Sequence, residues 1–180
     1  MTKPHLSTHL IHHPYAAPTE FSAPQQPVHK ASTVFFPDVA TMRSRRWLDK
    51  SGYTYGLHGT PTSFTLEERL CALEGGQQCL LVPSGLAAIS TVSLALLSQG
   101  DEVLIPDNAY GPKKDFAQHE LARSGIRYAF FNPMDVEDLR SKLSPATKLV
   151  WLEAPGSVTM EFPNLLAQVQ LVRQHGALSA

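Results

Sequence analysis

The sequence has few cysteines, no excess of charge of either sign and no long apolar run. Cys71 and Cys79 are too few for a disulfide framework and lack the spacing of zinc ligands, so we expect buried apolar side chains in a reducing cytoplasm. The formal net charge of −1 gives no electrostatic argument for nucleic acid as a partner. The longest apolar stretch, residues 85–97, contains three hydroxyl residues and is shorter than a membrane helix, which argues against a membrane partner.

The first 60 residues differ in character from the rest. They contain six prolines and no lasting helical period. A structureless stretch of this length is unusual inside a compact domain. We therefore expect residues 1–60 to form an extended arm that packs on a neighbouring subunit, with a partly disordered tail as the alternative.

Residues 61–180 show regular alternation of helical and extended patterns. Thr65 and Glu68 have the spacing of a capping box, which predicts a helix that ends at Gly75-Gly76. The pattern then predicts strands over 79–82, 102–106, 126–131 and 148–152, and helices over 85–99, 112–123, 136–143 and 165–175. This alternation is typical of an α/β fold whose mostly parallel sheet carries helices on both faces. A further strand would start where the chain stops, so we expect a longer parent protein.

Ligands of such sheets bind beyond the carboxyl ends of the strands. The loops after three expected strands, residues 83–85, 107–112 and 153–157, are rich in Gly, Pro and polar groups. In the first, Ser84 and Gly85 precede an apolar helix, whose free N–H groups and dipole suit a phosphate or another anion. An ordinary strand-to-helix turn is the alternative.

Single side chains at this edge are less specific. Tyr110 could stack on a flat cofactor, or be a half-buried loop residue. A hydroxyl such as that of Tyr55 could donate to a phosphate, or belong to a surface turn. Glu153 ends an apolar strand, where a structural hydrogen bond explains an acid more simply than catalysis does. His9 and His13 have helical metal-pair spacing but lack further ligands nearby, so we expect no metal site.

Six segments together resemble the pyridoxal-phosphate (PLP) enzymes of cysteine and methionine metabolism. They occur in the family's order, at residues 27–34, 55–60, 73–76, 83–88, 109–112 and 152–157. The resemblance implies the large domain of the aspartate-aminotransferase-like fold (fold type I) and PLP as cofactor. It implies that Ser84, Gly85 and Leu86 bind the cofactor phosphate. It also implies that Tyr110 stacks on the pyridine ring and touches the substrate, as the catalytic residue of this chain.

The resemblance further implies that Tyr55 reaches the phosphate of a neighbouring subunit, and hence a homodimer or a homotetramer. Where the family typically has an arginine two residues after this tyrosine, the sequence has Leu57 beside His58. The phosphate is then held less tightly, or another group substitutes. None of the seven lysines lies at a matching strand end, so we expect the Schiff-base lysine beyond residue 180.

The Pro155-Gly156-Ser157 turn is similar to that of the cystathionine β-lyases, which act in methionine biosynthesis. It therefore implies a lyase that converts cystathionine to homocysteine, pyruvate and ammonia. The alternatives are a cystathionine γ-lyase or synthase, a methionine γ-lyase, or a non-catalytic assembly or binding module. A nicotinamide-binding domain is disfavoured, because the first turn lacks Gly-x-Gly-x-x-Gly.

Overall fold

The computed structural model describes residues 27–46, 48 and 50–180, and its contacts divide the chain into two compact units between Leu81 and Val82. The histidine pair expected near the N-terminus lies outside the described residues. The predicted boundary at residue 60 concerns an arm that acts between subunits, and it stays a prediction.

In the described part of the first unit, the helices are α2 (Val39–Arg43) and α3 (Pro61–Glu74). The predicted capping box at Thr65 was wrong, because the N-cap of α3 lies five residues earlier. Thr60 is the N-cap, Ser63 completes a reciprocal box with it, and Pro61 occupies the first turn. Proline fixes a helical φ and needs no hydrogen-bond acceptor there, which favours the earlier start. Gly75 ends the helix in the left-handed conformation, with φ of 66°.

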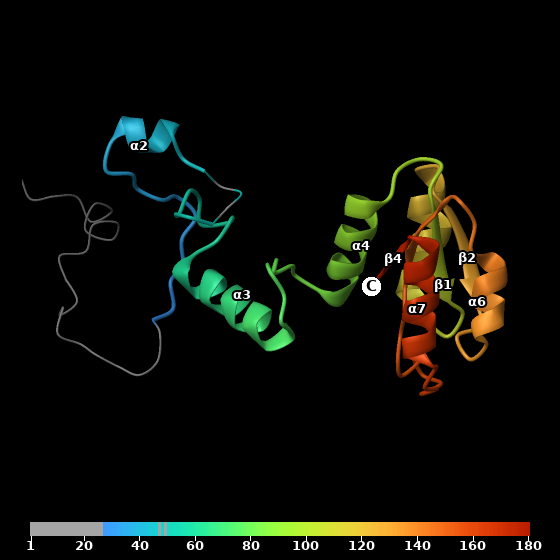
Figure 1. Cartoon of the computed structure of the whole chain (residues 1–180). Coiled ribbons are helices and arrows are strands. Elements are labelled where there is room, and N and C mark those ends of the chain that lie inside the picture. Colours follow the sequence, from blue (N-terminus) through green and yellow to red (C-terminus); the bar gives the residue numbers. More distant parts are fainter. Residues whose placement is uncertain (1–26, 47, 49) are drawn as a thin grey trace, which may run out of the picture. The chain divides into compact units, whose positions relative to one another are not determined.

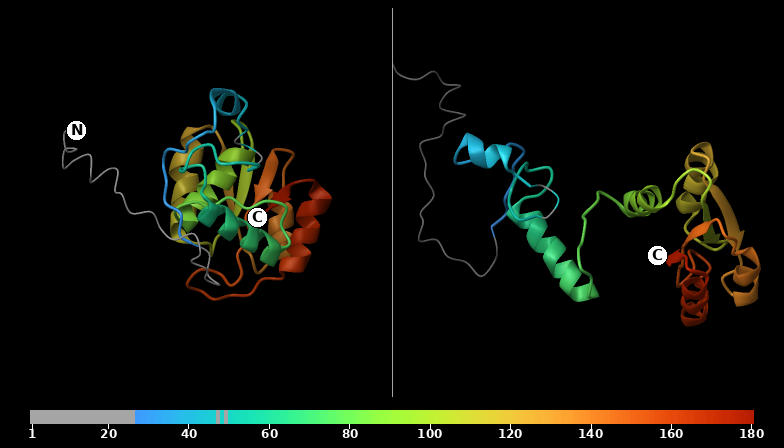
Figure 2. Two further views of the ribbon diagram at one scale, coloured as in Figure 1. Left: turned by 90° about the vertical axis from the view of Figure 1, so that its left-hand side faces the viewer. Right: turned by 45° about the horizontal axis from the view of Figure 1, so that its top comes forward.

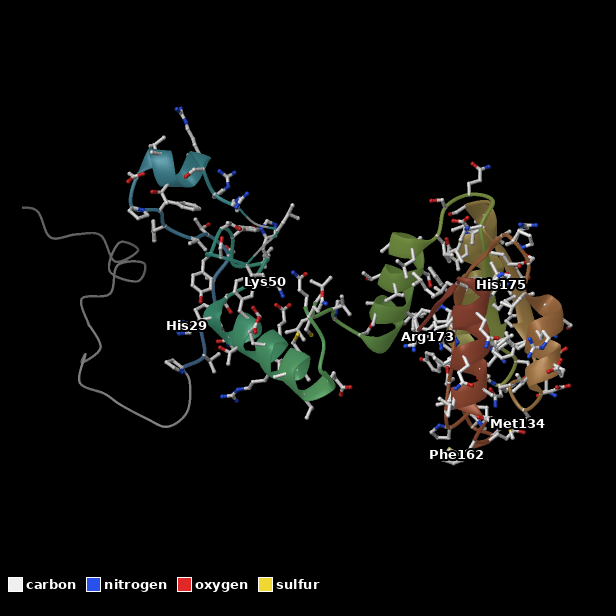
Figure 3. The ribbon with its side chains drawn as sticks, viewed as in Figure 1. His29, Lys50, Met134, Phe162, Arg173 and His175 are labelled. Carbon is white, nitrogen blue, oxygen red and sulfur yellow. The ribbon has the colours of Figure 1, made fainter. Side chains whose placement is uncertain are left out.

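The strand predicted over residues 79–82 does not form. The amide of Leu81 instead donates to the Glu67 carboxylate at 2.9 Å. The other carboxylate oxygen of Glu67 accepts from Lys50, which also donates to the carbonyl of Cys79 at 2.6 Å. Lys50 therefore joins this segment to α3 (Figure 3). An apolar run becomes a strand only where a neighbour pairs with it, and here the buried carboxylate of Glu67 takes the backbone donor.

The second unit is an α/β structure whose described strands form one parallel sheet (Figure 1). Its strands, in the order β2-β1-β3-β4, are β1 (Glu102–Pro106), β2 (Arg127–Phe131), β3 (Thr147–Val150) and β4 (Leu178–Ser179). Its helices are α4 (Gly85–Leu96), α5 (Gly111–Phe116), the π-helical segment η1 (Ala117–Leu121), α6 (Val136–Lys142) and α7 (Leu165–His175). The predicted fold class and parallel sheet are confirmed.

Helices cover both faces of this sheet, as predicted. Val103 and Ile105 of β1 pack with α4, α5 and η1, whereas Leu104 between them packs with α6 and α7. Successive side chains of a strand point to opposite faces, and this alternation divides the core into two layers. Figure 1 and the right-hand view of Figure 2 show α6 beside α7, with which it is in contact, and Arg173 and His175 mark the last turn of α7 in Figure 3.

Two smaller expectations also differ from the structure. Cys71 and Cys79 are free thiols, but they are half-buried rather than buried. The helix predicted over residues 112–123 widens into π geometry at Ala117–Leu121. Within the described ranges, no helix is long and apolar enough to cross a membrane.

Candidate functional site

The loops that follow β1 and β3 meet at the carboxyl edge of the sheet, as the sequence predicted. The amide of Tyr110, after β1, donates to Oε1 of Glu153, after β3, at 3.1 Å. The amide of Ser157 donates to the carbonyl of Asn108 at 2.9 Å. These two hydrogen bonds join segments more than 40 residues apart in the sequence, so the edge is one assembled structure.

Asn108 fastens the 153–161 loop to this edge. Its Nδ2 donates to Glu161 Oε2 at 2.9 Å, and its Oδ1 has no partner among the described residues although it is buried. A Cβ at Gly156 would lie 2.2 Å from Nδ2 of Asn108, so only glycine fits there. The Asn108 hydrogen bond, followed by one from Thr159, lowers the pKa of Glu161 below its ordinary value.

Lys113 is the group at this edge that sequence reasoning missed. Its Nζ donates to Glu153 Oε2 at 2.7 Å and lies 4.7 Å from the centre of the Trp151 ring. The side chains of Lys113 and Glu153 are 6% and 21% exposed. In the sequence, Lys113 and Lys114 follow a proline in the first turn of a helix, a pattern that is typical of a solvent-exposed face. Only the partner in the loop after β3, 40 residues away, reveals the burial.

The predicted anion turn at the start of α4 has the expected local geometry. Ser84 is the N-cap and accepts from the amide of Ala87 at 3.0 Å. The amides of Gly85 and Leu86 have no hydrogen-bond partner in the described part of the chain, and both residues are exposed. Two free N–H groups at the positive end of a helix of 12 residues suit a phosphate.

The direction of α4 places this turn toward the strands' carboxyl edge. Five residues connect the end of α4 to the start of β1, so the helix runs antiparallel to that strand. Ile89 and Val92 of α4 pack on the same core layer as Ala109 and Trp151. The structure gives no hydrogen bond between residues 83–86 and the Tyr110–Glu153 cluster. Tyr110 is 45% exposed, and its hydroxyl is not engaged by the described residues.

Tyr55 belongs to the first unit. Its ring meets that of His58 edge-on at 5.6 Å, and both residues line a hollow of about 590 Å³ together with Arg45. Gly56 donates to the carbonyl of Ser32 at 2.7 Å, and a Cβ on it would lie 2.0 Å from the Ala31 carbonyl oxygen. The two segments 27–34 and 55–60, separate in the sequence, are therefore in direct backbone contact. Leu57 is 75% exposed.

Comparison with known proteins gives the family that the six sequence segments resemble, and the match covers most of the chain. Residues 7–180 match the family of Cys/Met metabolism PLP-dependent enzymes. The sequence is 35% identical to cystathionine β-lyase of Salmonella typhimurium over 97% of this chain and 44% of that protein. It is 37% identical to cystathionine β-lyase MetC of Escherichia coli over 93% of this chain and 43% of that one. The L-methionine γ-lyase of Pseudomonas putida is 30% identical over 97% of this chain and 44% of its own length.

Solved structures of the same kind share the fold. A Campylobacter jejuni protein assigned as an O-acetylhomoserine (thiol)-lyase, whose structure carries a pyridoxyl-lysine-phosphate group, superposes with a TM-score of 0.81 at 26% identity, over 96% of this chain and 42% of that one. The chain thus spans less than half the length of these relatives. The assembled strand edge, the free helix N-terminus and these matches lead to one conclusion: the chain belongs to the family of Cys/Met metabolism PLP-dependent enzymes.

Proposed function

We propose that the parent protein is a cystathionine β-lyase, which cleaves cystathionine to homocysteine, pyruvate and ammonia in methionine biosynthesis. The observation that carries the proposal is the loop after β3. Its Gly156 fits against Asn108 because it has no side chain, and Ser157 bonds back to the same residue. This is the Pro-Gly-Ser turn that resembles the β-lyase branch. The 35% and 37% identities to two bacterial cystathionine β-lyases support the same choice.

The residues present fit PLP, the cofactor of this family. The free amides of Gly85 and Leu86, with Ser84 as the cap, supply donors and a helix dipole for a phosphate. The exposed ring of Tyr110 supplies a flat apolar surface at the same edge of the sheet. When bound, PLP withdraws electrons from the Cα of an amino-acid substrate. In this proposal, the amides hold the phosphate, and Tyr110 orients the ring and touches the substrate.

We place the lysine that anchors PLP in the part of the parent beyond residue 180. The lysine nearest the site, Lys113, is held by Glu153 and Trp151. Lys50 is held by Glu67. The chain spans less than half of its curated relatives, which leaves room for the anchor in the remainder.

We also propose that the site is shared between subunits of a homodimer or homotetramer. In this arrangement, Tyr55 reaches the phosphate of the neighbouring subunit, and Arg45 and His58 beside it take the place of the family's arginine. The shared hollow of Tyr55, His58 and Arg45 supports this, because it gathers a hydroxyl, an imidazole and a guanidinium at the arm. The free thiols support a cytoplasmic protein.

Product analysis of the full-length parent tests the proposal. Cystathionine should yield pyruvate and homocysteine in equal amounts, because the bond between Cβ and sulfur breaks. Formation of 2-oxobutanoate and cysteine from cystathionine, or of methanethiol from methionine, would instead assign a γ-lyase. Absence of all these products would contradict lyase activity and favour the assembly or binding role.

A further inference from the structure

The backbone of Tyr110 is held from both sides. Its amide donates to Glu153 Oε1 at 3.1 Å, and its carbonyl accepts from the amide of Lys113 at 2.9 Å. Lys113 then closes a ring of contacts, because its Nζ donates to the second oxygen of Glu153 at 2.7 Å. Backbone and Cα are therefore fixed, while 45% of the Tyr110 residue stays exposed at the edge of the sheet.

The pair is largely shielded from water, with side-chain exposures of 6% for Lys113 and 21% for Glu153. Lys113 lies between the Glu153 carboxylate and the indole of Trp151, a residue that is 9% exposed. Removing an ammonium and a carboxylate from water costs free energy that their attraction repays only in part. An apolar pair of similar volume would serve stability as well. A largely buried charged pair at this position is better explained by what it orients. Lys113 holds one oxygen of Glu153, and the other oxygen accepts from the amide of Tyr110.

The geometry points to Lys113 and Glu153 as a positioning pair, which sets the Tyr110 ring at the height and tilt needed to stack on PLP. This inference rests on the proposed function, in which Tyr110 contacts the cofactor. It assigns Glu153 a structural task, because both of its oxygens are engaged. It also gives Lys113 a role distinct from that of the cofactor-anchoring lysine.

The affinity of the full-length parent for PLP tests the pair. Apoprotein is titrated with PLP, and the dissociation constant is read from cofactor absorbance. Glu153→Gln and Lys113→Met should each weaken PLP binding about tenfold, and Lys113→Arg should restore most of the loss. In a Tyr110→Ala background, the same two changes should alter the dissociation constant less than about twofold, because the residue through which they act is gone.

The matched control is Lys142→Met. It breaks a lysine–carboxylate pair of the same 2.7 Å length, with Asp138, on the helix that packs with the other core layer. It should leave PLP affinity unchanged. If a single variant fails to fold, the double variant Lys113→Met/Glu153→Gln removes the pair without leaving one charge buried alone.

Two outcomes would overturn the inference. One is an unchanged PLP affinity when the pair is broken in the presence of Tyr110. The other is an equal loss in the wild-type and the Tyr110→Ala backgrounds, which would mean that the pair acts on the fold generally. The readout is cofactor affinity rather than turnover, so it remains valid whichever product cystathionine yields.

Discussion

Every buried apolar side chain in the described part of the chain belongs to residues 82–180, whereas residues 27–81 bury Glu67 and Gly59. The second unit has a core on each face of its sheet. The segments of the first unit are held to one another by close backbone approaches and polar hydrogen bonds, and Phe35 in this unit is 96% exposed. The comparison teaches that the second unit contains its own hydrophobic stabilisation. The first needs a further surface, which agrees with the proposed arm between subunits.

The largest effect should come from the core of the second unit. Phe131→Ala deletes a side chain that is 0% exposed and should lower the free energy of unfolding by about 3–5 kcal/mol, because a cavity remains. Phe162→Ala, at a residue that is 70% exposed, is the control and should change it by less than about 0.5 kcal/mol. Urea unfolding followed by Trp151 fluorescence in a Trp47→Phe background measures both. Equal effects would remove the distinction between core and surface.

The second prediction tests whether Tyr55 of one subunit completes the site that contains Tyr110 of its neighbour. Tyr55→Ala and Tyr110→Ala in the full-length parent should each lose most lyase activity. Mixing the two variants at equal amounts, with unfolding and reassembly, should produce intact sites at about a quarter of positions, because each mixed dimer has one. Activity that stays at the level of the separate variants would place both tyrosines in the same subunit's site. Reassembly of each variant alone is the control.

The third prediction tests the close backbone approach between Gly56 and Ala31 within the first unit. Gly56→Ala places a Cβ 2.0 Å from the Ala31 carbonyl oxygen, so the two segments must separate. We expect a loss of about 1–3 kcal/mol in the free energy of unfolding of this unit. Gly52→Ala is the matched control, since nothing lies within 4 Å of its added Cβ. Hydrogen exchange of the Gly56 region measures the change. Protection that equals the wild type would show that the contact is dispensable.

The fourth prediction concerns the departure from the family at Leu57. Leu57→Arg restores a permanent cation two residues after Tyr55 and should tighten PLP binding by the full-length parent about three- to tenfold. Leu57→Gln, which is polar but uncharged, should change it little. If Arg45 already supplies a cation to the phosphate, Arg45→Ala will weaken binding in the wild type and much less in Leu57→Arg. An unchanged PLP affinity in both Leu57→Arg and Arg45→Ala would show that this part of the arm does not contact the phosphate.

The smallest effect should appear at Glu161. Its lowered pKa means that the bond to Asn108 contributes to folding above the unfolded value near 4.5, and is lost as pH falls through the lower folded value. The 153–161 loop should therefore loosen only at acid pH, a change that the side-chain amide signal of Asn108 can follow by NMR. Glu161→Gln should abolish this titration. A transition that persists in Glu161→Gln would assign it to another carboxylate.

Sequence-based prediction succeeded where residues within an element define it, and failed where residues outside the element decide its start or its pairing. β1 was predicted to the residue, and α7 likewise, because a short apolar run defines the strand and a proline–glycine frame defines the helix locally. The strand expected over residues 79–82 failed, because its Leu81 donor belongs to Glu67 of the preceding helix. The start of α3 failed because two capping boxes compete within nine residues, and Pro61 favours the earlier one.

The sequence by itself determined the α/β class, the order of the motifs, the free amides at the start of α4 and the choice of Tyr110 as the edge residue. These depend on neighbours a few residues apart, whose preferences are set by backbone geometry. Only the tertiary structure decided that Lys113 is buried against Trp151 and that Glu153 holds the amide of Tyr110. Those contacts join residues about 40 apart, and side-chain burial of this kind arises only when two strands bring their loops together.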